Sequence, residues 1–171
     1  MAKPGYLDDN AKGYYDSDLN QVVSEVPIIS PGSVLQYTYS RLDTYIYLGA
    51  DSAYLNLMSV TITPKRSNSI MVIQHTSSGI HRALAGAVGR ILRKVSGQSD
   101  QEIYLNNRWS YGNDPTYWAS INFGFTCNDT PGTTSAVTYQ LQGLAQTTGT
   151  DSNLRWNDGL MGFLHVWEIG Q

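Results

Sequence analysis

The sequence has few charged residues and one cysteine, and each scarcity excludes a class of protein. Only 15% of its 171 residues are charged, against about 25% in a typical globular chain, which disfavours long surface helices with Lys/Glu faces. Cys127 is the single cysteine, so neither an intrachain disulfide nor a cysteine zinc cluster can form. The 11 Lys and Arg residues are scattered and the net charge is −3, so we expect no nucleic-acid partner.

Long apolar runs are absent as well. No stretch approaches the roughly 18 residues that a membrane-spanning helix needs, and the first residues lack the apolar segment of a signal peptide. We therefore expect no membrane insertion. The length of 171 residues suits one ordinary domain, whose core requires no disulfide or metal.

Motifs for catalysis and for cofactors are also missing. The sequence has no Gly-x-Ser-x-Gly elbow and no phosphate-binding Gly-x-x-x-x-Gly-Lys-Ser/Thr loop. His75, His81 and His165 lack metal-binding spacing, so we interpret them as structural histidines. We interpret Cys127 as a structural thiol, because no local pattern suggests an activating partner. The sequence therefore predicts a protein that is not an enzyme and has no cofactor and no metal site.

Carboxylates leave one enzymatic alternative open. A glycoside hydrolase needs two carboxyl groups roughly 5–9.5 Å apart, and the sequence contains 14 acidic residues. Most of those beyond the first 32 residues lie in predicted turns, where Asp is expected for structural reasons. Glu168 is the exception, because it falls in a predicted aromatic strand at the end of the chain. Polysaccharide hydrolysis is therefore a minor hypothesis.

The sequence does contain a series of strand patterns separated by turn residues. Met58, Val60 and Ile62 alternate with Ser and Thr, and Pro64 ends this run. Strands are predicted at 34–39, 54–63, 70–73, 87–95, 101–105, 117–127, 135–144 and 160–169. Breaks or loops are predicted at 77–79, 106–115 and 149–159. This pattern predicts an all-β fold, an antiparallel jelly-roll-like β-sandwich of about eight strands.

Residues 80–95 have two interpretations. Their apolar residues fit the stripe of an amphipathic helix. However, Gly86 and Gly89 would each cost about 1 kcal/mol in a helix interior. A strand over 87–95 is therefore favoured, and the helix is the alternative.

The first 32 residues differ in composition from the rest. They hold five of the 14 acidic residues, two of the 11 basic residues and three of the six prolines. A disordered tail is one interpretation. We favour an extended N-terminal arm for attachment, followed by a β-sandwich domain at 33–171, because the arm contains tyrosines and paired Val and Ile residues. The candidate attachment residues are Tyr6, Asp8, Asp9, Tyr14, Tyr15, Asp16 and Asp18.

Amide, guanidinium and aromatic side chains gather in the predicted loop at 106–115. Sugars bind by stacking on aromatic rings and by hydrogen bonds to such polar groups. The alternative is that Trp109 and Trp118 fill one end of the core. The candidate ligand-binding residues are Asn107, Arg108, Trp109, Tyr111 and Asn113, with Trp156 from the predicted loop at 149–159.

Basic residues concentrate at one place in the sequence. The cluster consists of Arg82, Arg90, Arg93 and Lys94. Because the arm is acidic, the cluster is a candidate for subunit contacts with the arm of a neighbouring copy. A solvated face is the alternative interpretation.

Five stretches carry a family resemblance through their order and spacing. They are PGSVLQ at 31–36, VTITP at 60–64 followed by SIMV at 69–72, RILR at 90–93, DTPGTTSAVTYQLQ at 129–142 and VWEI at 166–169. Together they resemble a β-sandwich module of tailed-phage virion-surface proteins, found in capsid decoration proteins and tail-fibre tips and common in marine phages. The resemblance spans nearly all of the sequence after residue 30.

The resemblance implies a homotrimer on the virion surface, without catalytic residues. Fibre modules usually cap a long stalk, whereas a 32-residue arm precedes this module. We therefore expect a bacteriophage structural protein, a capsid decoration or head-fibre protein that its arm attaches to a major capsid or tail protein. The alternative is a receptor-binding tail-fibre tip or tail adaptor that recognises a host surface glycan.

Overall fold

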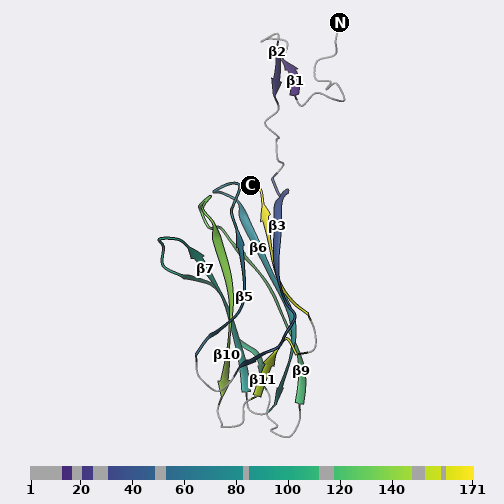
Figure 1. The fold of residues 1–171 in the computed structure, drawn as a ribbon. Coiled ribbons are helices and arrows are strands. Elements are labelled where there is room, and N and C mark those ends of the chain that lie inside the picture. Colours follow the sequence, from purple (N-terminus) through teal and green to yellow (C-terminus); the bar gives the residue numbers. More distant parts are fainter. Residues whose placement is uncertain are drawn as a thin grey trace. The chain divides into compact units, whose positions relative to one another are not determined.

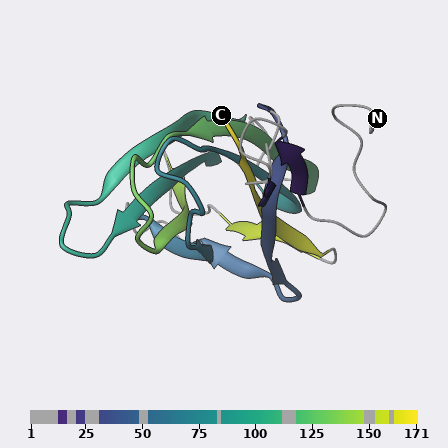
Figure 2. The ribbon, with the colours of Figure 1, turned by 90° about the horizontal axis from the view of Figure 1, so that it is seen from above.

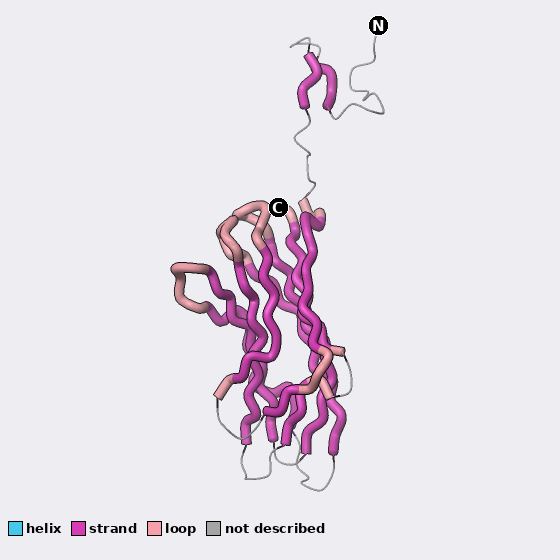
Figure 3. The backbone as a smooth tube through the Cα atoms, viewed as in Figure 1, coloured by secondary structure: helices cyan, strands magenta, loops and turns pink. Residues whose placement is uncertain are grey.

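The computed structural model describes residues 13–16, 21–24, 31–48, 53–82, 85–111, 118–147, 153–158 and 161–171. The chain separates into two compact units, Met1–Ser30 and Pro31–Gln171. Across these described ranges, strands are joined by loops and turns and no helix is present (Figure 3). Consequently, none of the described segments is a helix that could span a membrane.

The first unit contains a small antiparallel sheet. Its strands are β1 (Gly13–Asp16) and β2 (Gln21–Ser24), with Tyr14 opposite Val23 and Tyr15 opposite Val22. Tyr and Val favour strands because they pack well on a pleated surface. We did not predict these strands, because four residues are too few to establish a period. The predicted attachment residues Tyr6, Asp8, Asp9 and Asp18 lie outside the described residues.

The described part of the second unit contains ten strands (Figure 1). They are β3 (Val34–Leu42), β4 (Ile46–Leu48), β5 (Leu55–Ile62), β6 (Ile70–Arg82), β7 (Ala85–Val95), β8 (Gln101–Tyr111), β9 (Trp118–Asp129), β10 (Val137–Thr147), β11 (Asn153–Trp156) and β12 (Gly162–Ile169). Eight of them are long, and β4 and β11 are short. The short strands escaped prediction because each exposes too few alternating residues to be distinguished from a loop.

The eight long strands form two antiparallel sheets in jelly-roll order. One sheet has the order β5-β10-β7-β8. The other has the order β3-β12-β6-β9, and it is extended by β11, which pairs with β6, and by β4, which pairs with β11. Counted among the long strands, the orders are second-seventh-fourth-fifth and first-eighth-third-sixth, the arrangement of a jelly roll. Figures 1 and 2 show β3 and β12 side by side, although they lie at opposite ends of this unit's sequence. The predicted antiparallel jelly-roll-like sandwich is confirmed.

The core lies between the sheets and follows the alternation of residues along each strand. In β12, Leu164 and Val166 are fully buried, whereas the odd-numbered residues are partly exposed. In β10, Val137, Tyr139 and Leu141 point inward in the same way. The period of two that identified these strands in the sequence therefore also separates core from surface.

The strand interpretation of residues 87–95 is confirmed, and the helix alternative is wrong. β7 pairs with β10 along its whole length and with β8 on its other side. Ladder hydrogen bonds on both edges compensate for the low strand preference of Gly86 and Gly89, an effect that local propensity does not include.

The predicted break at 77–79 is wrong, because β6 continues without interruption to Arg82. A Cβ atom on Gly79 would lie 2.3 Å from Cε2 of Phe123 and 2.8 Å from the carbonyl oxygen of Arg155. Gly79 therefore does not end the strand. It permits the close approach of β9 and β11 on the two sides of β6, which is a known role of glycine within sheets.

We predict that Gly79→Ala destabilises the fold by about 2 kcal/mol, because the new methyl group overpacks against Phe123 and a backbone oxygen. Urea unfolding measures this change. Gly124→Ala is the matched control on the neighbouring strand, since its Cβ would meet only the carbonyl oxygen of His75 at 3.6 Å. Equal stabilities of the two variants would contradict this account of Gly79.

Candidate functional site

Glu168 is a fully buried carboxylate that anchors a loop. It lies on the inner face of β12 and accepts hydrogen bonds from the backbone N–H groups of Lys65 (2.8 and 3.0 Å) and Arg66 (3.1 Å). The Ser69 hydroxyl (2.7 Å) and the Gln36 amide (2.5 Å) also donate to it. Burial by itself would raise the pKa of Glu168, but these hydrogen bonds together hold the pKa below its ordinary value.

This geometry gives Glu168 a structural role. Both carboxylate oxygens are occupied by donors from the β5–β6 loop and from β3. The carboxylate is therefore committed to closing the sandwich between β12 and that loop. The sequence signal that drew attention to Glu168, an acid in an aromatic strand, reflects this anchoring.

We predict that Glu168→Gln destabilises the fold by about 2–3 kcal/mol at pH 7, because an amide cannot accept from so many donors and its N–H₂ group faces them. Because the folded-state pKa is lowered, the contribution of Glu168 is present above its unfolded pKa and is lost as the pH falls through the folded value. Glu102→Gln is the control, since Glu102 is an exposed partner of Arg90 at 3.4 Å. Denaturant unfolding of both variants measures the difference, and a cost no larger than that of Glu102→Gln would refute the anchoring role.

His75 is fully buried on the inner face of β6. Its Nδ1 lies 2.9 Å from the carbonyl oxygen of Phe163, and its Nε2 lies 3.0 Å from the Ser77 hydroxyl. Because a carbonyl can only accept, Nδ1 carries the proton and Nε2 accepts from Ser77. Burial lowers the pKa of His75 to about 4, so the ring is neutral at pH 7.

We predict that His75 makes the fold progressively less stable between pH 6.5 and pH 4. In this range the unfolded chain binds a proton at His75 before the folded chain does, so stability falls as pH falls, by up to about 3 kcal/mol. His75→Gln removes this part of the pH dependence. Unfolding free energies measured across the range test it, and parallel curves for the two proteins would contradict it.

Cys127 is partly buried on β9. Burial, reinforced by the negative charge of Asp129, raises the pKa of its thiol to about 11. The thiol is therefore protonated at neutral pH, which fits the interpretation of Cys127 as a structural residue.

The three described members of the basic cluster have partners within their own unit. Arg93 forms an ion pair with Asp129 at 2.8 Å, and the Tyr139 hydroxyl donates to the same carboxylate at 2.8 Å. This clasp joins the two sheets, because Asp129 lies on β9 and the other two residues lie on β7 and β10. Lys94 pairs with Asp100 at 3.0 Å.

Arg90 is held on the outer face of the four-stranded sheet. Its guanidinium donates to Gln142 at 2.8 Å and to Glu102 at 3.4 Å, and it lies 3.8 Å from the centre of the Tyr54 ring. The side chain of Arg82 lies outside the described residues. The contact of this cluster with a neighbouring subunit stays a prediction.

The structure separates the predicted ligand-binding residues. The backbone of Asn107, Arg108, Trp109 and Tyr111 belongs to β8 and not to a loop, which corrects the prediction for 106–111. Pairing with β7 extends the strand beyond the end that the local sequence indicates. The side chains of these residues, and all of Asn113, lie outside the described part of the chain. Their ligand-binding role stays a prediction.

Trp156 lies in the core and not in a loop. It belongs to β11, is fully buried, and stacks on Phe123 with ring centroids 4.2 Å apart. The prediction of a continuous loop at 149–159 is therefore wrong at 153–156. Leu154 and Trp156 point inward from alternate positions of a strand, so the ring offers no exposed face to a ligand.

An aromatic ladder that the sequence alone does not predict lies on the outer face of the six-stranded sheet. We define the ladder as Tyr37 and Tyr39 of β3 with Phe163, His165 and Trp167 of β12. Its neighbouring ring centroids lie 5.3–6.3 Å apart, within the range of favourable aromatic pairs. The Tyr37 hydroxyl and Nδ1 of His165 are hydrogen-bonded at 2.7 Å. Alternation within each strand hinted at the ladder, but only the pairing of β3 with β12 assembles it.

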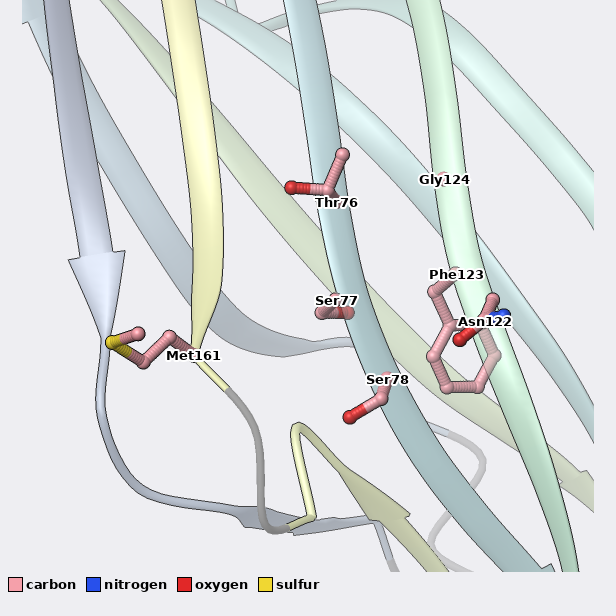
Figure 4. A pocket seen from close by; sticks show the side chains of 7 residues that line it. All are labelled: Thr76, Ser77, Ser78, Asn122, Phe123, Gly124 and Met161. Carbon is pink, nitrogen blue, oxygen red and sulfur yellow. The ribbon is translucent and has the colours of Figure 1, made fainter.

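A hollow of about 320 Å³ lies on the same sheet (Figure 4). Its walls come from β6, from β9 and from the residue before β12. They are Thr76, Ser77, Ser78, Asn122, Phe123, Gly124 and Met161. No charged residue lines it, so it suits an uncharged group.

Comparisons with known proteins show a partial likeness to virus particles. No family model and no curated protein matches the chain. One similar solved structure is the infectious bursal disease virus VP2 subviral particle, with 12% identity and a TM-score of 0.46 over 81% of this chain and 34% of that one. Another, the infectious bursal disease virus Gx strain, has 11% identity and a TM-score of 0.40 over 80% of this chain and 33% of that one. The chain thus spans about a third of the length of these proteins, and the likeness concerns the backbone arrangement alone.

Proposed function

We propose that the chain is a structural protein of a tailed-phage virion. In this proposal it is a homotrimeric capsid decoration or head-fibre protein on the virion surface, attached to a major capsid or tail protein through residues 1–32. The observation that carries the proposal is the contrast between the two units. One is a closed jelly roll with a large core, and the other contains a sheet of two four-residue strands.

The small sheet supports attachment because it is too short to be stable by itself. An isolated two-stranded hairpin is at best marginally stable in water. The sheet pairs Tyr14 with Val23 and Tyr15 with Val22. Aromatic and branched apolar residues of this kind favour burial against a partner surface.

Charge supports the same role. Residues 1–32 have a net charge of −3 and residues 33–171 are formally neutral. The docking surface should therefore be basic, and attachment should weaken with salt. On a symmetric shell, several weak contacts of this kind combine into firm attachment.

A non-enzymatic role is supported by the use of the ionisable groups in the jelly roll. Glu168, His75 and Asp129 are engaged in hydrogen bonds and ion pairs that hold strands together. The resemblance of the sequence to the phage module supports a location on the virion.

We predict that deleting residues 1–30 leaves a folded jelly roll that no longer joins the particle, because the docking unit is gone. Incorporation into virions, measured by electrophoresis of purified particles, tests this. In the full-length chain, replacing Tyr14 and Tyr15 by Ala should weaken incorporation in the same direction. The matched control replaces Tyr45 and Tyr47, which are 55% and 49% exposed on the jelly roll. Normal incorporation of the truncated chain would refute attachment through this unit.

The second candidate is a receptor-binding tail-fibre tip or tail adaptor that recognises a host surface glycan. It is favoured by the aromatic and amide residues of β8, including Asn107, Trp109 and Tyr111. Locating the protein on the particle by electron microscopy distinguishes the two candidates. A position on the head supports decoration, and a position at the tail tip supports receptor binding.

A further inference from the structure

The outer faces of the two sheets differ in charge. On the four-stranded sheet, the outward positions include Arg90, Lys94 and Glu102, each in an ion pair. The six-stranded sheet presents rows of uncharged residues across its strands. One row runs Tyr39, His165, Gln74 and Thr126, and the next runs Tyr37, Trp167, Val72 and Asn128.

On the outer face of the six-stranded sheet, the charged side chains that the structure describes lie at the margins. Arg41, at the edge of the row through Phe163, pairs with Asp43. Arg155, on β11, lies 4.0 Å from Asp158. An uncharged aromatic centre with a charged rim is the composition of a protein–protein interface, in which Tyr, Trp, Phe and Met are enriched and Lys, Glu and Asp are depleted.

This face also carries both protruding and recessed features. Tyr37 is 47% exposed, Tyr39 54% and Met161 53%, although all three have large apolar side chains. The tyrosines lie on β3, at one edge of the face, whereas the hollow of about 320 Å³ lies over paired residues of β6 and β9 and is also lined by Met161, just before β12. A cyclic assembly that sets the β3 side of one copy against the face over β6 and β9 of the next would bring the protrusion and the hollow together.

The edge strand β9 is a second, independent indication. It pairs with β6 from Met71 to Arg82 in an unbroken register, and no other described strand pairs with it. Its sequence has no Lys, Arg or Pro, the residues that usually protect an exposed edge. A long and regular edge without such protection favours a neighbour that covers it.

A second copy of the chain fits these observations better than another partner. Residues near a symmetry axis meet their own copies, so a charge there would be opposed by the same charge. A face whose centre carries no charge can therefore associate with itself. The charged outer face of the four-stranded sheet does not meet this condition.

We propose that the outer face of β3, β12, β6 and β9 is the subunit interface, with Tyr37 and Tyr39 of one copy packed into the β6–β9 hollow of the next. The inference deepens the proposed function and rests on it only for the number of subunits. It requires neither a particle nor an attachment partner.

The test is the molar mass of the full-length chain, measured by light scattering over a range of concentrations. Tyr39→Glu places a charge on the aromatic ladder, and Met161→Glu places one beside the hollow. Each should weaken association at least about tenfold, because a charge in the contact is desolvated without a partner. Leu105→Glu is the control, since Leu105 is 42% exposed on β8 of the other sheet and its variant should keep the wild-type mass.

A wild-type chain that is monomeric at micromolar concentration would overturn the proposal. A monomeric chain that binds neutral glycans through this face would overturn it as well. So would variants at both positions that retain the oligomeric mass and the wild-type circular dichroism. If Tyr39→Glu fails to fold, Met161→Glu decides by the same criterion. Incorporation of the truncated chain into particles would refute attachment through residues 1–32, but it would not change the molar mass of the full-length chain. The proposed attachment and the proposed subunit interface can therefore be refuted separately.

Discussion

Each strand of the jelly roll must bury alternate residues between two sheets, and β12 shows how much depends on this constraint. Its even-numbered residues Leu164, Val166 and Glu168 face inward and are fully buried. Its odd-numbered residues Phe163, His165 and Trp167 supply three of the five rings of the aromatic ladder. A shift of one residue in the pairing with β6 would move the carboxylate to the surface and the aromatic rings into the core. The buried core residues of β12, the anchoring of the β5–β6 loop by Glu168 and the aromatic outer face therefore all depend on the register between β12 and β6.

β6 holds the six-stranded sheet together because it has partners along both edges. Its first half pairs with β12, its second half with β11, and its whole length from Met71 with β9. Two strands can follow one another along one edge because the segment between them is pinned. Asn157, in the left-handed region at φ 63°, donates from its backbone N–H to the carbonyl of Ser78 at 2.7 Å. Its side-chain amide donates to the carbonyls of Leu42 and Thr44, so the β3–β4 corner is fixed to the same point.

Ionisable groups inside this molecule connect elements that are distant in the sequence. Glu168 ties β12 to the β5–β6 loop, His75 ties β6 to β12, and Asp129 ties β9 to β7 and β10. Each group is satisfied by hydrogen bonds or an ion pair, which offsets the cost of burial. The buried acid and the buried imidazole of this chain therefore hold its strands together.

The sequence by itself determined the all-β class, the approximate positions of the eight long strands, the compositional break near residue 32 and the absence of catalytic motifs. These properties are local, since a period of two, a proline or a charge balance is visible in a short window. Only the tertiary structure decided which aromatic residues are buried and which are presented. Trp156 lies in the core and His165 in the outer ladder, although both follow alternating patterns. The physical reason is that the alternation along a strand shows that its two faces differ in polarity. It does not show which other elements of the fold each face contacts. The partners of Glu168 at Lys65 and of His165 at Tyr37 lie 103 and 128 positions away, and such contacts exist only after the sheets have formed.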